Sequence, residues 1–285
     1  MQTKTFSNPE GFSFASVGSG SKGNATLVKT NSTTLLIDCG FSATELLKRL
    51  PRLGMSGSDI DCIFLTHEHS DHSTGVVSLC RQLNIPLYAS WGSSVALRER
   101  GAKLDTIELR HINCGERIKV GELDVLPVLV PHDAREPLQF VIQSNEQRFG
   151  ILTDIGSISK HVIEHFQNVD SLLLEFNHDA DMLRFGPYPA SLKARVGGDW
   201  GHLSNAQAAS FLEHIDLKRL QRILIAHISE KNNSFEAVEA LLQPALQSAH
   251  AIECIYASQD KGSAWMPVLA TNEYNAQETR FAALA

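Results

Sequence analysis

The sequence has no long hydrophobic run and no basic start followed by an apolar stretch. No segment reaches the roughly 20 apolar residues that a helix needs to cross a bilayer, although 43% of the 285 residues are hydrophobic. The first residues also lack the charged and apolar regions of a secretory signal peptide. These absences predict a cytoplasmic protein with a sizeable core and no membrane partner.

Cysteine and net positive charge are also scarce. The five cysteines are odd in number and widely spaced, and none forms a pair with zinc-ribbon spacing. They fit small core side chains in a reducing compartment better than a disulfide framework. The formal net charge of −7 argues against a surface that coats nucleic acid indiscriminately. It still allows a local anion site, because bound divalent cations would supply a positive centre.

Short hydrophobic runs and amphipathic segments divide the sequence into strands and helices, without an internal repeat. The predicted strands cover residues 12–17, 25–29, 34–37, 60–65, 86–89, 117–120, 123–130, 138–143, 148–153, 170–175, 222–226, 251–257 and 263–268. The predicted helices cover residues 43–53, 73–84, 92–100, 158–166, 204–214 and 234–245. This order predicts two sheets packed face to face with helices outside. We expect one domain over residues 1–270, followed by a variable tail at 271–285.

Residues 65–72 place three imidazoles and a carboxylate within six residues, directly after an apolar strand. His67 and His69 are two apart in an extended segment, so they point the same way and can hold one ion. Asp71 and His72 fall where the chain turns back, and they are placed to hold a second ion. A chance cluster of surface histidines is the alternative. The run is internal, however, and it includes an Asp at a fixed offset, which favours a metal site.

Three other strands end in a residue that can bind a metal. His132, Asp154 and His227 each follow an apolar run. One such His alone would more often be structural. With the first cluster present, three strand ends meeting at one sheet edge would complete the ligand shells of two ions.

This order of ligands resembles the metallo-β-lactamase superfamily, whose pattern is H-x-H-x-D-H, then a His, an Asp and a final His. The resemblance spans residues 12–257 and implies an α/β (α+β) fold, a four-layer αββα sandwich of two mixed sheets with outer helices. It implies one metal on His67, His69 and His132, a second on Asp71, His72 and His227, and a bridging Asp154. It also gives Asp38 a supporting place near the metal loop, with a turn residue before Gly40 as an equal alternative. Because the antibiotic-hydrolysing branch typically has Cys at the bridging position, lactam hydrolysis is not expected.

Within the superfamily, four segments resemble the WalJ/YycJ (VicX) family of cytoplasmic nucleases: residues 19–26, 174–179, 201–205 and 227–233. The resemblance implies a phosphodiesterase acting on nucleic acid, with 5′-to-3′ exonuclease activity on DNA. One alternative is a small-molecule hydrolase of the same fold, cleaving a cyclic phosphodiester, a lactone or a thioester. Another is a non-catalytic regulatory or binding protein, which the intact ligand set argues against.

The ligand set predicts two divalent cations and a hydrolytic mechanism. Nitrogen- and oxygen-rich ligands favour zinc, and manganese or iron would also fit. Two such ions about 3.5–4 Å apart would present a metal-bridging hydroxide near neutral pH and would clamp phosphate oxygens. Asp71 is then hypothesised to orient that hydroxide as well as to bind the second ion.

His202 is the candidate general acid. It precedes Ser204, which is predicted to N-cap the helix at 204–214. The free amides of this helix start would favour a phosphate near Ser204 and Asn205, and His202 could protonate the departing oxygen. Glu175, at a strand end, could orient His202. The alternative is a His that only closes the loop by hydrogen bonding.

Residues 184–198, here called the basic insert, contain Arg184, Lys193 and Arg195, no acidic residue, and Tyr188 between two prolines. Its cations could neutralise phosphates, and Tyr188 could stack on a base. A solvated loop with a small helix is an equal alternative. The predicted partner is nucleic acid, DNA in preference to RNA, and the sequence does not indicate an oligomeric state.

Three further residues have open roles. Lys22 and Asn24 lie on a Gly-Ser-rich loop where they could touch substrate, and a plain turn is as good a reading. His178 could line the substrate entrance or hold its loop. The remaining histidines lack ligand spacing and are predicted to lie at the surface, in helices or turns: His111, His161, His165, His214 and His250.

Overall fold

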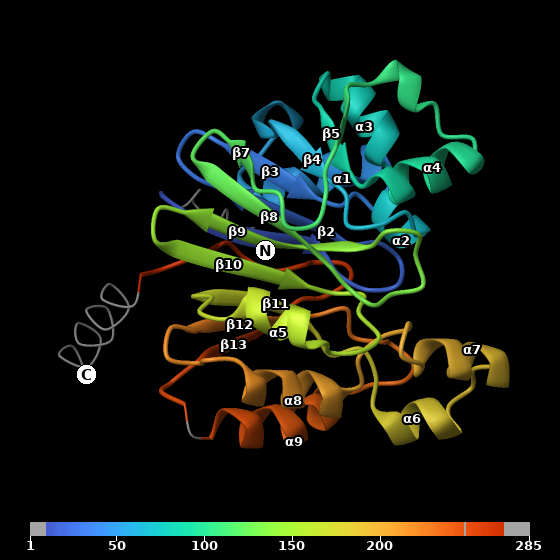
Figure 1. Cartoon of the computed structure of the whole chain (residues 1–285), viewed down its shortest axis with the longest axis vertical. Coiled ribbons are helices and arrows are strands. Elements are labelled where there is room, and N and C mark those ends of the chain that lie inside the picture. Colours follow the sequence, from blue (N-terminus) through green and yellow to red (C-terminus); the bar gives the residue numbers. More distant parts are fainter. Residues whose placement is uncertain (1–9, 248, 271–285) are drawn as a thin grey trace, which may run out of the picture.

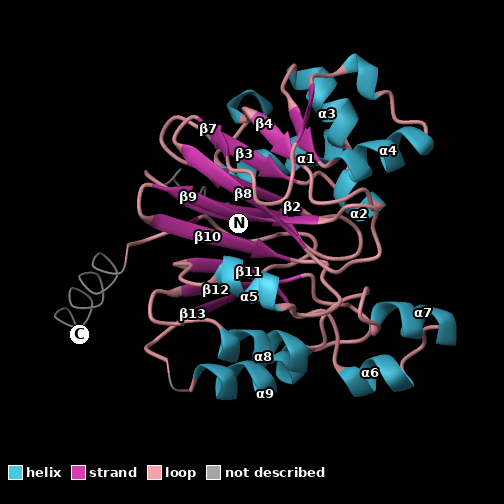
Figure 2. Ribbon diagram, viewed as in Figure 1, coloured by secondary structure: helices cyan, strands magenta, loops and turns pink. Residues whose placement is uncertain are grey.

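The computed structural model describes residues 10–247 and 249–270. Within them, two seven-stranded mixed sheets pack face to face, and helices cover both outer faces (Figures 1 and 2). This arrangement confirms the four-layer αββα sandwich. The helices of the described residues are all too short or too polar to span a membrane.

The first sheet has the strand order β14-β1-β2-β3-β4-β5-β6. Its strands are β1 (Ser13–Gly18), β2 (Ala25–Lys29), β3 (Thr34–Ile37), β4 (Cys62–Phe64), β5 (Leu87–Ala89), β6 (Leu109–His111) and β14 (Met266–Pro267). Strands β3 to β6 are parallel, so helices connect them. The helices of this half are α1 (Ala43–Arg49), α2 (Ser70–Ser73), α3 (Val76–Leu83) and α4 (Trp91–Glu99).

The second sheet has the order β13-β12-β11-β10-β9-β8-β7. Its strands are β7 (Ile118–Val120), β8 (Leu123–Leu129), β9 (Leu138–Ser144), β10 (Gln147–Leu152), β11 (Ser171–Glu175), β12 (Arg222–Ala226) and β13 (Glu253–Tyr256). The helices of this half are α5 (Lys160–Phe166), α6 (Ala180–Phe185), α7 (Ala190–Val196), α8 (Asn205–His214) and α9 (Phe235–Leu246). Helices α5, α8 and α9 cover the sheet, whereas α6 and α7 lie beyond its edge (Figure 1).

Both faces of the central strands are buried, which explains their continuous hydrophobic sequences. In β12, Leu224 faces the core between the sheets, while Ile223 and Ile225 face the helices, as the two-residue period of a strand requires. Phe14 and Phe149 stack across the two sheets with ring centroids 3.9 Å apart. Packing on both sides holds the strand ends in fixed positions.

The structure corrects several of the predicted elements, and helices α6 and α7 were not among them. The helix expected at 73–84 divides into α2 and α3, because the amide of Gly75 donates to the carbonyl of Cys39 (2.8 Å) instead of continuing the helix. The helix expected at 43–53 ends at Arg49 and continues as a 3₁₀ turn that contains Pro51. The strand expected at 263–268 shortens to β14, and β6 was not predicted, so His111 lies in a strand. The proposed tail at 271–285 falls outside the described residues.

The carboxyl ends of β3, β4, β8, β10, β11 and β12 bring their following loops together at one edge of the sandwich. All the predicted ligands lie in these loops or in α2.

Candidate metal centre

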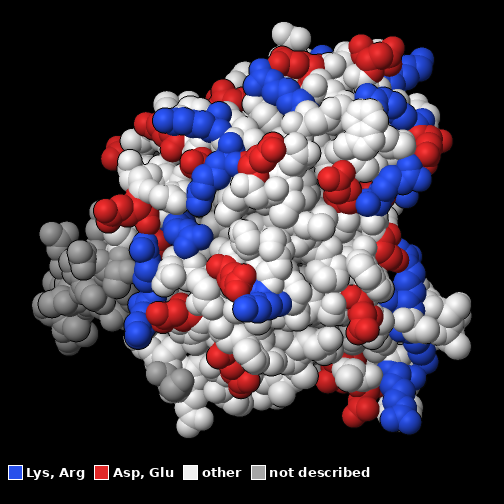
Figure 3. Space-filling model, in the orientation of Figure 1, with Lys and Arg blue, Asp and Glu red and all other residues white. Residues whose placement is uncertain are grey.

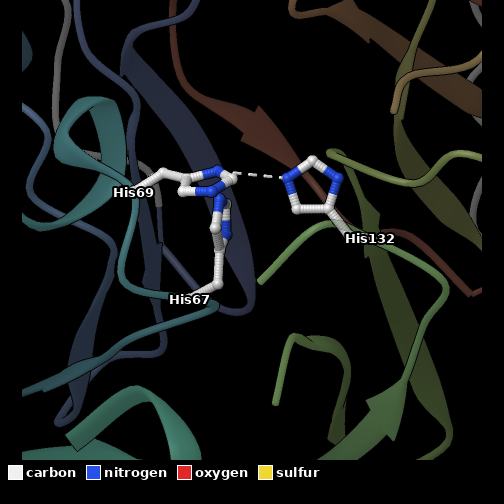
Figure 4. Close-up of side chains that lie close together, drawn as sticks. All are labelled: His67, His69 and His132. Carbon is white, nitrogen blue, oxygen red and sulfur yellow. Dashed lines mark hydrogen bonds between the residues drawn. The ribbon is translucent and has the colours of Figure 1, made fainter. Parts of the chain in front are cut away.

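Three histidines converge from two different sheets. His67 and His69 follow β4, and His132 follows β8 (Figure 4). Nδ1 of His69 lies 3.2 Å from Nε2 of His132, and Nε2 of His67 is buried without a hydrogen-bond partner. Burial lowers the pKa of His67 well below its ordinary value, with a further contribution from His72. A neutral imidazole with an unused buried nitrogen is suited to bind a metal.

A second group lies beside the first and contains two carboxylates. Oδ2 of Asp154 lies 3.1 Å from Nε2 of His72, and its Oδ1 lies 3.5 Å from Nε2 of His227. Oδ2 of Asp71 is 3.5 Å from the same His227 nitrogen. Asp154 is only 2% exposed, and its charge also acts on His67 and His132 of the first group. Asp154 therefore belongs to the second group by contact and influences the first by its charge.

The charges within the second group stabilise one another. Burial alone would lower the pKa of His227, but Asp154, Asp71 and Glu175 outweigh it and raise that pKa to about 9. Burial likewise opposes ionisation of Asp154, and His227 and His72 hold its pKa well below the ordinary value. The carboxylates of this group thus favour positive charge on the neighbouring imidazoles, and divalent cations would supply positive charge at the same place.

Three residues of the site adopt left-handed backbone conformations that residues other than glycine rarely use. Asp38, Asp154 and His227 have φ angles of 62°, 52° and 51°. Asp38 and His227 directly follow β3 and β12, and Asp154 is the second residue after β10, so each lies where the chain turns at the edge of a sheet. Such strain clusters at functional sites.

Further polar contacts fix the orientation of the metal-facing imidazoles. Nδ1 of His72 lies 2.7 Å from Asp38, whose two carboxylate oxygens also accept from the amide and hydroxyl of Thr66, each at 2.8 Å. The structure therefore places Asp38 against a candidate ligand. Asn177 lies 3.0 Å from Nδ1 of His227. Thr66 and Asn177 were not predicted, although Thr66 directly precedes the His motif and Asn177 lies in the segment 174–179.

His202 lies beside the second group. Its Nδ1 is 3.2 Å from Oε2 of Glu175 and 3.7 Å from Oδ1 of Asp154. Glu175 is fully buried and also accepts from the amides of Asp154, Ile155 and Leu203, at 3.0, 3.1 and 2.9 Å. One carboxylate thus holds both the loop after β10 and the segment that carries His202.

The predicted start of α8 is confirmed at Ser204, whose hydroxyl accepts from the amide of Gln207 at 3.3 Å. Asn205 is buried and exchanges two hydrogen bonds with Asn233, each 2.8 Å. Ser204 and Asn205 therefore hold the helix start and the adjacent loop together. Neither side chain lines the cavity described next.

A cavity of about 520 Å³ opens above the two groups. Its walls are formed by Ser21, His69, Ser70, Asp71, Arg100, Asp133, Asp154, Asn177, Tyr188, Arg195, Val196, Gly201, His202, His227, Ile228 and Ser229. Tyr188 and Arg195 of the basic insert thus reach it. Arg100 and Asp133 were not predicted, because they come from α4 and from the β8 loop without any spacing signal.

The other predicted substrate residues lie away from this cavity wall. Asn24 is buried, and its amide donates to the carbonyl of Asp71 at 2.7 Å, so it supports the metal loop. Lys22 forms an ion pair of 2.8 Å with Glu230. Lys193 is half-buried and donates to the carbonyl of Arg184 at 2.8 Å. Lys22 and Lys193 remain available only to a substrate that extends beyond the cavity.

His178 is 3% exposed and holds its loop, because its carbonyl accepts from the amide of Asn205 at 2.8 Å. Burial lowers its pKa from 6.5 to about 4. Between these values the unfolded chain binds a proton that the folded protein does not, so the free energy of unfolding falls as the pH falls through this window, by up to about 3 kcal/mol.

We therefore expect His178→Gln to flatten the dependence of stability on pH between 6.5 and 4. Urea unfolding of both proteins in a chelator, across this window, measures the effect, since the metal ligands then contribute equally to both. Equal slopes for the variant and the unaltered protein would contradict the assignment.

Comparisons with known proteins agree with this geometry. Residues 33–228 match the family described as Beta-lactamase superfamily domain. The exodeoxyribonuclease WalJ of Streptococcus pneumoniae is 33% identical over 242 residues, which cover 84% of this chain and 90% of that protein. The exodeoxyribonuclease YycJ of Bacillus anthracis is 32% identical over 239 residues, with coverages of 83% and 90%.

A solved structure supports the fold independently. The metallo-β-lactamase fold protein YhfI of Bacillus subtilis superposes with a TM-score of 0.69, and the match covers 90% of this chain and 99% of that chain. At 15% identity this likeness concerns the fold alone. With the sandwich, the site geometry and the two exodeoxyribonucleases in agreement, the chain belongs to the β-lactamase superfamily and, within it, to the family of WalJ and YycJ.

Proposed function

We propose that this protein is a dinuclear metal-dependent phosphodiesterase that acts as a 5′-to-3′ DNA exonuclease in the cytoplasm. The observation that carries the proposal is the meeting of seven His and Asp side chains at one edge of the sandwich, beside His202 and beneath a cavity with two arginines. The relatives named as exodeoxyribonucleases supply the choice of DNA and of end-directed cleavage. Five unpaired cysteines fit a reducing compartment.

The residues present fit two divalent cations. Nε2 of His67 is buried without a hydrogen-bond partner, and Nε2 of His227 has carboxylate oxygens no nearer than 3.5 Å. Burying a polar atom without a partner costs free energy, and a bound ion would remove that cost. Imidazole nitrogens and carboxylate oxygens suit zinc, with manganese or iron as alternatives. When bound, two such ions would lower the pKa of a water and neutralise charge on the phosphate.

Each remaining polar residue at the site has a role in this proposal. Asp71 borders the cavity and would orient the attacking water while binding the second ion. His202 presents Nε2 toward the departing oxygen, because its Nδ1 faces Glu175. Glu175 acts as a positioning residue that fixes the imidazole plane.

The cavity and its rim can bind a phosphate backbone. Arg100 and Arg195 lie in the wall, and Tyr188 offers an aromatic face beside them. Figure 3 shows Lys and Arg side chains, with Asp and Glu side chains among them, where Figure 1 places α6 and α7. The cations of the basic insert would favour a polyanion over a neutral ester.

The test is hydrolysis of end-labelled single- and double-stranded DNA and RNA by the metal-loaded protein, beside bis-p-nitrophenyl phosphate and a circular DNA. We expect stepwise release of nucleotides from linear DNA and none from the circle. Cleavage of the circle would exclude an exonuclease, and a preference for RNA would overturn the choice of DNA. Hydrolysis of the small ester alone would favour the second candidate, a small-molecule phosphodiesterase, which a cavity of about 520 Å³ could also serve.

The basic insert gives a prediction about salt. Reversing two charges in the variant Lys193→Glu/Arg195→Glu should reduce the slope of log affinity against log salt by about 1.4 for single-stranded DNA, since each lost phosphate contact removes about 0.7. Fluorescence anisotropy over a range of salt concentrations measures the slope. The matched control is Lys119→Glu/Lys218→Glu, which changes two exposed cations outside the cavity wall by the same charge. Equal slopes for the two double variants would remove the insert from the binding surface.

A further inference from the structure

A second cavity of about 390 Å³, here called the side groove, adjoins the metal cavity. Ile228 and Ser229 line both of them. The loop at 18–24 also borders both, with Gly20 facing the groove and Ser21 the metal cavity. The ion pair between Lys22 and Glu230 connects the loop at 18–24 to the loop after β12. A ligand held at the metal cavity can therefore continue directly into the groove.

The groove is walled by an exposed aromatic ring. Phe235, the first residue of α9, is 58% exposed. Its ring meets Tyr256 edge to face, with centroids 5.1 Å apart and planes at 88°, which fixes the ring and leaves it accessible. Ile228 and Ala257 extend the apolar wall, and the serines and Gln259 offer polar groups around it. A flat, partly polar ring system such as a nucleobase matches this surface.

The charges around the groove limit how much of a nucleic acid can enter. Glu230 and Glu236 border it, and none of the described residues that line it is Lys or Arg. A run of phosphates would be repelled there, whereas the basic insert accepts them on the α7 side of the metal cavity. The groove therefore suits a single base at the end of a strand, with the rest of the polymer on the opposite side.

We propose that the side groove binds the terminal nucleobase of the strand being degraded, stacked on Phe235, and so favours cleavage at ends. This inference rests on the proposed nuclease function and adds to it the residue that recognises the end.

The experiment compares kcat/KM on three single-stranded DNA substrates: one with all its bases, one that lacks the terminal base, and one that lacks an internal base. Stacking of one base contributes about 1–3 kcal/mol, about 5- to 150-fold. We expect Phe235→Ala to lower kcat/KM about tenfold on the complete strand and to leave it unchanged on the strand without its terminal base. Phe235→Trp should restore the complete-strand rate. Leu241→Ala, an exposed position on the same helix, is the control and should match the unaltered protein.

Three results would overturn the inference while the nuclease function stands: no loss with Phe235→Ala, equal losses on all three substrates, or an internal missing base as harmful as a terminal one. Equal losses would mean that Phe235 has only a structural role. If the unaltered protein cleaves no DNA at all, the proposed function fails, and this inference fails with it.

Discussion

Asp154→Asn is expected to lower the hydrolysis of DNA by more than about 100-fold and to reduce the amount of bound metal. Loss of an outer partner of a metal ligand typically costs about 10- to 100-fold, and in the proposed function Asp154 would bind the ions itself. Asn keeps the size of the side chain and tolerates the left-handed φ of 52°. Asn lacks the negative charge that interacts favourably with His72 and His227. Metal analysis and a DNA assay on the same sample measure the two effects, and circular dichroism checks that the variant is folded.

The variant Asp154→Ala distinguishes the loss of a metal-binding side chain from the strain of the left-handed backbone. It should lose activity as Asp154→Asn does, and in addition it should lose about 1–2 kcal/mol of stability, because Ala pays a steric cost in the left-handed region. Thermal unfolding in a chelator gives the comparison. If Asp154→Asn kept full activity with its full metal content, Asp154 would not be a shared ligand, and the two groups of side chains would have to act separately.

The part of the site that could be predicted from the sequence is the part that depends on local spacing. His67 and His69 share a side of one extended segment, and His132, Asp154 and His227 each end a hydrophobic strand, so their convergence follows from two packed sheets. The two sheets themselves follow from strands that are hydrophobic throughout, as in β12.

The parts that could not be predicted depend on contacts between distant segments. Arg100 reaches the cavity from the end of α4, and Asp133 pairs with Arg195 of the basic insert, and no local spacing in the sequence indicates either contact. The division between α2 and α3 depends on a hydrogen bond from Gly75 to Cys39, in a segment more than thirty residues earlier. Asn205 illustrates the opposite case. The sequence places it at a helix start that would suit an anion, whereas in the structure its side chain is bonded to Asn233.

Two buried carboxylates have matching structural roles, one in each sheet. Asp38 at the end of β3 accepts from Thr66 and holds the His motif after β4, while Glu175 at the end of β11 accepts from backbone amides and holds the loop after β10. Each therefore connects a ligand-bearing loop to the neighbouring strand. Glu175 differs because it also contacts His202, so the same carboxylate that holds the loop after β10 also contacts the proposed general acid.

His202→Gln is expected to lower kcat on DNA by about 100- to 10,000-fold, the range that a general acid contributes. The departing oxygen of DNA belongs to a sugar hydroxyl and needs a proton, whereas p-nitrophenolate leaves without one. The same variant should therefore lose less than about tenfold on bis-p-nitrophenyl phosphate. His214→Gln, the same change at an exposed position on α8, is the control and should retain both activities.

The ratio of the two losses decides the role of His202. If it donates a proton from Nε2, DNA cleavage falls far more than ester cleavage. If His202 only closes its loop by the contact with Glu175, the cavity is disturbed for every substrate and the two losses are equal. Equal losses, with the metal content unchanged, would assign the proton to a water and leave Glu175 as a support for the β10 loop alone.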